Sequence, residues 1–157
     1  TGNNEGHMFG ITNDYNVFLF GNICMSPLSN IILNKKIISI SCGMDHAGII
    51  DSNNVLYMCG SNEYGKAGLG GDLNTTVFVK INELSGISVG ISCGIDTTAV
   101  ITNDIVDNLY TCGNNYAGQL GNGTTDTQYV FGRVGFNKKV INAKLHKFTF
   151  KSGNNGW

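Results

Sequence analysis

The sequence predicts an all-β protein built from repeated units of four short strands, and three observations support this. Ile, Val, Thr, Phe and Tyr are plentiful, there is one proline, and Gly accounts for 22 of the 157 residues. β-branched and aromatic residues favour strands, whereas Asn and Gly tolerate the positive φ of tight turns. The second observation is an internal repeat. The third is that no segment shows an amphipathic helical period over three turns.

Two blocks of the chain occur twice and in the same order. LYMCGSNEYGKAGLG at 56–70 and LYTCGNNYAGQLGNG at 109–123 share eight of fifteen residues. ISCGMD at 40–45 and ISCGID at 91–96 share five of six. Agreement of this extent in two ordered blocks is far beyond chance, so the chain is made of repeated structural units.

The N-terminal part is a contracted copy of the same unit. HMFGITNDYNVFLFGN at 7–22 parallels HAGIIDSNNVLYMCGSN at 46–62, but the Gly-rich segment that should follow is missing. The predicted organisation is therefore one partial domain over 1–157, with approximate repeats at 1–41 (contracted), 42–92 and 93–157.

The full unit contains four apolar runs that each suit a strand of about five residues. These runs are 37–42, 46–51, 55–59 and 77–81. Gly-Met-Asp, Ser-Asn-Asn and the Gly-rich loop separate them. Four short strands in about 50 residues are typical of a β-propeller blade, whereas a β-solenoid would need shorter repeats.

Composition and charge exclude several function classes. The net charge is −1, so no basic field exists to hold a polyanion, and direct nucleic-acid binding is not expected. A lysine-rich cluster within 138–151 fits a solvated strand face better than a nucleic-acid patch. No apolar run approaches the roughly 20 residues of a membrane span, so we expect no membrane association.

The five cysteines include no Cys-x-x-Cys pair, which argues against both a zinc site and a disulfide framework. Four of them occur as Cys-Gly at equivalent repeat positions, which is typical of small buried hydrophobes. We therefore expect reduced thiols, a reducing compartment, and no metal or other cofactor.

Two catalytic interpretations are weaker than a structural one. A phosphate-binding loop needs a helix after its glycines, but the segment after Gly70 returns to a strand. A cysteine-dependent hydrolase would use Cys42 with His46, yet a nucleophile is rarely repeated in every blade. Since no paired carboxylates stand out either, we predict no catalytic residue and no enzyme activity.

The repeated blocks also resemble a known family. Cys-Gly-x-Asn-x-x-Gly-[Lys/Gln]-[Ala/Leu]-Gly, and the Cys-Gly-x-Asp-His block before it, resemble the repeat of the regulator of chromosome condensation family. Residues 42–70 match nearly throughout, and 93–123 match with Thr97 in place of the histidine. The resemblance implies a propeller, usually seven-bladed, of which this chain holds roughly three blades. We therefore expect a fragment completed by the remaining blades or by a second copy.

Within that family the resemblance implies a protein-interaction module without chemistry of its own. The partner would be another protein, such as a small GTPase or a chromatin component, in an intracellular setting, cytoplasmic or nuclear. The alternative is a guanine nucleotide exchange factor for a Ran-type GTPase with chromatin association. A cysteine-dependent hydrolase is a second, weaker alternative.

Eight residues are candidates for contacting that partner. The resemblance points to the turn after each Cys-Gly, where acidic and histidine side chains face the GTPase in the exchange factor. These turns hold Asp45, His46 and Asp96. In the Gly-rich loops, residues that differ between the copies are expected to be exposed, namely Glu63, Tyr64, Lys66, Tyr116 and Gln119. The simpler interpretation is that the aspartates cap their turns.

Overall fold

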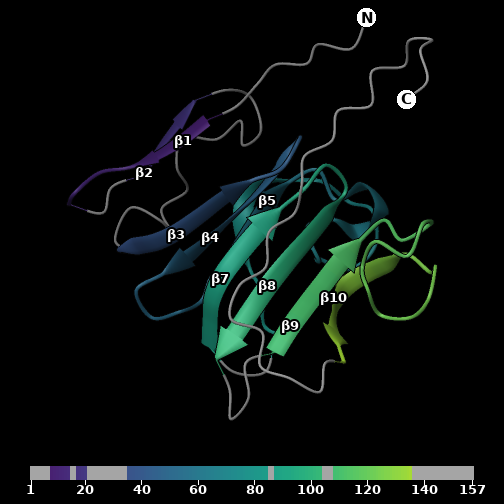
Figure 1. Cartoon of the computed structure of the whole chain (residues 1–157). Coiled ribbons are helices and arrows are strands. Elements are labelled where there is room, and N and C mark those ends of the chain that lie inside the picture. Colours follow the sequence, from purple (N-terminus) through teal and green to yellow (C-terminus); the bar gives the residue numbers. More distant parts are fainter. Residues whose placement is uncertain (1–7, 15–16, 21–34, 85–86, 104–107, 136–157) are drawn as a thin grey trace, which may run out of the picture.

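The computed structural model describes residues 8–14, 17–20, 35–84, 87–103 and 108–135 (Figure 1). Its elements in these ranges are β1 Met8–Ile11, β2 Val17–Phe20, β3 Ile37–Cys42, β4 His46–Asp51, β5 Leu56–Gly60, the 3₁₀ turn η1 Glu63–Gly65, β6 Thr75–Lys80, β7 Ile87–Cys93, β8 Thr97–Asn103, β9 Asn108–Gly113 and β10 Gln128–Val134.

The strands form two four-stranded antiparallel sheets and one hairpin. One sheet has the order β3-β4-β5-β6, the other has the order β7-β8-β9-β10, and β1 pairs with β2. Figure 1 shows the two large sheets side by side, with β7 facing β3 and β4. The predicted all-β fold of four-stranded antiparallel propeller blades is confirmed.

The predicted strands agree with the observed ones to within two residues. β3 and β4 match the predicted bounds, whereas β5 begins at Leu56 and β6 at Thr75. Val55 belongs to the preceding turn because its backbone N–H donates to Oδ1 of Asp51, at 3.0 Å. Asp51 thus caps the β4–β5 turn through its buried carboxylate, as Asx residues do.

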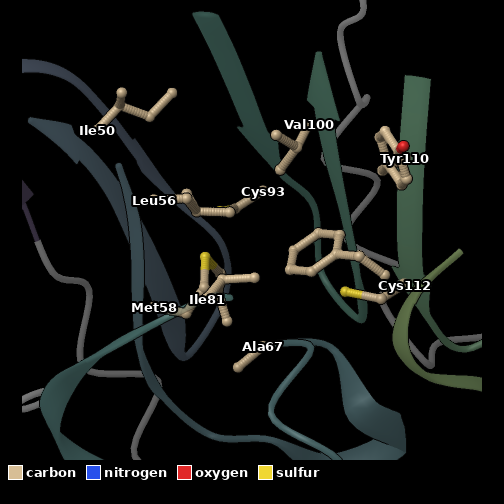
Figure 2. Packing of buried hydrophobic residues seen from close by; sticks show 10 residues of the cluster. Ile50, Leu56, Met58, Ala67, Ile81, Cys93, Val100, Tyr110 and Cys112 are labelled. Atoms are coloured by element: carbon tan, nitrogen blue, oxygen red, sulfur yellow. The ribbon is translucent and has the colours of Figure 1, made fainter. Parts of the chain in front are cut away.

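The main core lies between the two sheets. Ile50, Leu56 and Met58 of the first sheet face Cys93 and Val100 of the second in one buried cluster (Figure 2). Full burial of a Leu, Ile or Met side chain contributes about 1.5–3 kcal/mol. All six residues of β4 are buried, which explains why this strand reads as a nearly continuous apolar run.

The two ends of the sheets differ in the kind of connection that they carry. We call one end the turn end, which consists of the β3–β4 turn (43–45), the β7–β8 turn (94–96) and the Gly-rich loops (61–74 and 114–127). Its two short turns are joined directly, since the backbone N–H of Met44 donates to the carbonyl of Gly94, at 3.2 Å. The opposite end carries the turn after β4 (52–55).

Some predictions fall outside the described ranges. The lysine-rich segment within 138–151 lies there. In the ranges that are described, no helix is long and apolar enough to cross a membrane.

Candidate functional site at the turn end

Four of the predicted residues come together where the two sheets meet. Nζ of Lys66 lies 2.8 Å from Oδ1 of Asp45 and 3.3 Å from Oδ1 of Asp96. The two aspartates belong to equivalent turns of neighbouring blades, and His46 follows Asp45 with its Nδ1 3.9 Å from Oδ1 of that residue. Asp45, His46, Lys66 and Asp96, which we call the inter-blade cluster, therefore bind the two blades to each other.

The expectation that Lys66 is exposed is wrong. Its side chain is only 1% exposed, whereas those of Asp45 and Asp96 are 45% and 34% exposed. The reason is that the Gly-rich loop folds inward between the blades. Gly65 and Gly68 have φ values of +73° and +68°. These conformations turn the aliphatic part of the Lys66 side chain into the interior. Its ammonium group is paired there with the two aspartates.

The imidazole of His46 is fully buried and belongs to a chain of hydrogen bonds. The Thr98 hydroxyl donates to the Lys66 carbonyl, at 2.6 Å, and Nε2 of His46 lies 2.8 Å from the same hydroxyl oxygen. Because a hydroxyl carries one proton, that oxygen must accept from His46, so Nε2 carries a proton. Thr98 therefore orients the imidazole of His46 from the neighbouring blade.

The charges of the inter-blade cluster shift the pKa values of two members. Burial raises the pKa of Asp45, but the neighbouring side chains of His46 and Lys66 lower it more strongly, to about 2. Burial lowers the pKa of His46, but the sulfur of Cys93 and the carboxylate of Asp45 outweigh that effect and raise it to about 9. Both shifts favour the charged forms, so the inter-blade cluster pairs opposite charges.

An asparagine in each Gly-rich loop braces the loop from inside. Oδ1 of Asn62 accepts from the backbone of Ala67, and Oδ1 of Asn115 accepts from that of Leu120, both at 3.0 Å. Both asparagines are fully buried. Our sequence reasoning missed this role, although the identical Asn in both copies was the signal that could have revealed it.

The remaining predicted residues are on the surface of the turn end. Glu63 is exposed and Tyr116 is 71% exposed. The ring centroids of Tyr64 and Tyr116 lie 6.1 Å apart in an edge-to-face arrangement. Gln119 is also exposed, but its side chain is occupied within its own loop, since its Oε1 accepts from the backbone of Ala117, at 2.9 Å.

Charge is segregated between the two ends of the described sheets. The carboxylates at the turn end are Asp45, Glu63, Asp72, Asp96 and Asp126. Lys66 is the sole described lysine or arginine there, and it is buried. The described lysines and arginines of the opposite end are Lys35, Lys36, Lys80 and Arg133. The turn end therefore presents a negative surface.

The cysteines differ from the expectation in one respect. Cys59 is disulfide-bonded, so the prediction of reduced thiols is wrong for this residue. Cys42, Cys93 and Cys112 form no disulfide, and burial raises the pKa of Cys112 well above its ordinary value. Cys112 is thus held as an unreactive thiol. No group of His, Cys, Asp and Glu in the described part of the chain could hold a metal ion.

Comparisons with known proteins agree with the repeat pattern and the sheets. Residues 37–66 match the family model of the regulator of chromosome condensation (RCC1) repeat. The chain is 38% identical over 100 residues to the X-linked retinitis pigmentosa GTPase regulator of Mus musculus, which covers 63% of this chain and 10% of that protein. The chain thus spans about a tenth of this relative.

Solved structures show the same fold. The structure of human WBSCR16 has a TM-score of 0.74 at 22% identity and covers 88% of this chain and 40% of that one. Prp20p from Saccharomyces cerevisiae, studied for its binding to Gsp1p and histones, has a TM-score of 0.68 at 16% identity, covering 83% of this chain and 36% of that one. With the matched repeat and the two antiparallel blades, these likenesses confirm the predicted resemblance: the chain carries an RCC1 repeat and is similar to RCC1-type propellers.

Proposed function

We propose that this chain is a non-catalytic protein-interaction module and that the turn end is the surface that contacts the partner. The observation that carries the proposal is the inter-blade cluster. Lys66 holds the carboxylates of Asp45 and Asp96 side by side at the surface, so neighbouring blades present one rigid charged unit. Preorganised groups of this kind lose little conformational entropy on binding, which favours recognition.

The domain organisation is part of the same proposal. We take 1–157 as one partial propeller with repeats 1–41, 42–92 and 93–157, completed by further blades or by a second copy. Each repeat boundary between the described blades falls near the end of the first strand of a sheet, because β3 ends at Cys42 and β7 ends at Cys93. We also propose an intracellular location, cytoplasmic or nuclear, which the buried thiols of Cys93 and Cys112 favour.

Affinity capture tests the module. The immobilised chain is expected to retain a defined protein that is lost from the Asp45→Ala/Asp96→Ala variant. The matched control is Glu83→Gln, which removes an exposed carboxylate from the opposite end. If both variants retain the same proteins as the unmodified chain, the turn end is not the partner-binding surface.

The second candidate function is guanine nucleotide exchange on a Ran-type small GTPase. It is favoured by two similar proteins, one called a GTPase regulator and one studied for binding to Gsp1p and histones. Release of labelled GDP from a purified Ran-type GTPase separates the two functions. Acceleration that is lost in Asp45→Ala would replace the pure scaffold by an exchange factor, whereas an unchanged release rate supports the scaffold.

A further inference from the structure

The aromatic pair Tyr64–Tyr116 is not needed to build the loops that carry it. In the repeat alignment Tyr64 corresponds to Ala117, and Tyr116 corresponds to Glu63. The pair thus joins non-equivalent positions of neighbouring blades, and each loop is braced independently by its own asparagine. Tyr116 is exposed and Tyr64 is half-buried, and aromatic rings at the surface that do not support the fold are typical of recognition surfaces.

The surroundings of the pair are negative. The carboxylate of Glu63 raises the pKa of Tyr64, and Tyr116 and Asp96 add to that effect. Lys66 opposes it, but its ammonium group is buried and shared between Asp45 and Asp96. An incoming cation would therefore meet aromatic faces and carboxylates without a competing surface lysine among the described residues.

A buried polar atom lies under the same surface. His46 is fully buried, and its Nδ1 has no hydrogen-bond partner among the described residues. This nitrogen lies beneath the carboxylate of Asp45, at 3.9 Å from its Oδ1. In the charged imidazole this nitrogen carries a proton, so it favours the ionised form of Asp45 at the surface that a cation would approach.

We propose that the Tyr64–Tyr116 pair, with Glu63 and Asp96 beside it, binds an arginine side chain of the partner protein. This inference rests on the proposed function, because it names the chemistry of that partner. A guanidinium group stacks flat on an aromatic ring while donating hydrogen bonds to carboxylates at its edge. A lysine ammonium is more strongly hydrated and cannot stack in this way. A phosphate-bearing ligand would be repelled by the negative surface.

Peptide titration tests the chemistry directly. Gly-Arg-Gly-Arg-Gly is compared with its lysine counterpart and with a citrulline counterpart, which keeps the shape of arginine without its charge. We expect the arginine peptide to bind at low salt, the lysine peptide to bind about fivefold more weakly, and the citrulline peptide not to bind. Equal affinity for the arginine and lysine peptides would overturn the proposal, since simple charge attraction would then suffice.

Matched variants locate the site. Tyr116→Leu should weaken binding of the arginine peptide about fivefold, whereas Tyr116→Phe keeps the ring and should change it less than about twofold. Glu63→Gln should weaken binding, and Glu83→Gln at the opposite end should not. Unchanged binding in Tyr116→Leu would show that the peptide binds elsewhere.

Two further outcomes separate this inference from its alternatives. A second copy of the chain could offer Arg133 from its own opposite end. Concentration-dependent association in sedimentation that Arg133→Gln abolishes would make that copy the occupant and would overturn the partner proposal. If no peptide binds while affinity capture still depends on Asp45 and Asp96, the arginine site is wrong and the proposed function stands.

Discussion

At the scale of single residues, Lys66 has a different role in the structure from the one that its sequence position predicts. In the sequence it is a variable position in a Gly-rich loop, opposite Gln119 in the second copy. In the structure its ammonium group is buried between two carboxylates from different blades. A buried cation that lacks partners is costly, so the aspartates and Lys66 are mutually dependent.

The depressed pKa of Asp45 predicts a loss of stability in acid. Its folded pKa of about 2 lies below the ordinary 3.8, so the carboxylate stabilises the fold above about pH 4. That contribution disappears as the pH falls through about 2. We expect the thermal unfolding midpoint to decline between pH 4 and pH 2 in the unmodified chain, as measured by circular dichroism.

The Asp45→Asn variant should show a smaller decline over this pH range, because the titrating group has been removed. Glu83→Gln, which removes an exposed carboxylate from the opposite end, should follow the unmodified chain. An equally steep decline in Asp45→Asn would mean that other carboxylates cause the acid sensitivity.

At the scale of the elements, the glycine of each Cys-Gly pair sets the backbone conformation at which the third strand of a sheet ends and the Gly-rich loop begins. Gly113 ends β9 with φ +113°, and Gly60 ends β5 with φ +102°. A Cβ at Gly113 would collide with the carbonyl oxygen of Asp96 in the adjacent β7–β8 turn. The glycine thus permits both the backbone conformation and the close approach of the turn that carries the site.

Gly113→Val should therefore destabilise the chain by about 3 kcal/mol or more, through backbone strain and overpacking. Urea denaturation followed by fluorescence measures the loss. Gly135→Val is the matched control, since a Cβ there meets no atom within 4 Å. Similar losses in the two variants would argue that valine disturbs the chain for a reason other than the Asp96 contact.

At the scale of the whole molecule, the two blades are joined by an apolar core and by the inter-blade cluster. The core buries apolar surface between the two sheets, whereas Lys66 makes the charged contacts between them at the turn end. The cluster is polar and directional, so it fixes how the turns of the two blades align. The negative surface of the turn end follows from that alignment.

Lys66→Met should lower the free energy of unfolding by about 2–3 kcal/mol. Removing the cation leaves two neighbouring carboxylates unpaired, and their partial exposure keeps the loss at the lower end of the usual range. Lys80→Met, an exposed lysine of β6, is the matched control for denaturation. A loss in Lys66→Met no larger than in the control would contradict the coupling role of the inter-blade cluster.

Much of the local structure could be predicted from the sequence because its causes are local. Alternating apolar runs, turn glycines and the double repeat predicted strands and four-stranded blades, with errors of one or two residues where a side chain such as Asp51 caps a turn. The same residues carried the family resemblance. These features depend on short-range backbone preferences, which every copy of the repeat expresses in the same way.

The sequence by itself thus determined the strand pattern, the repeat and the family resemblance, together with the turns that carry Asp45 and Asp96. Only the tertiary structure decided that Lys66 is buried between those turns, that Thr98 orients the His46 imidazole, and that Tyr64 meets Tyr116. The physical reason is that these contacts join different blades. Their formation depends on how the sheets pack, which no local pattern records.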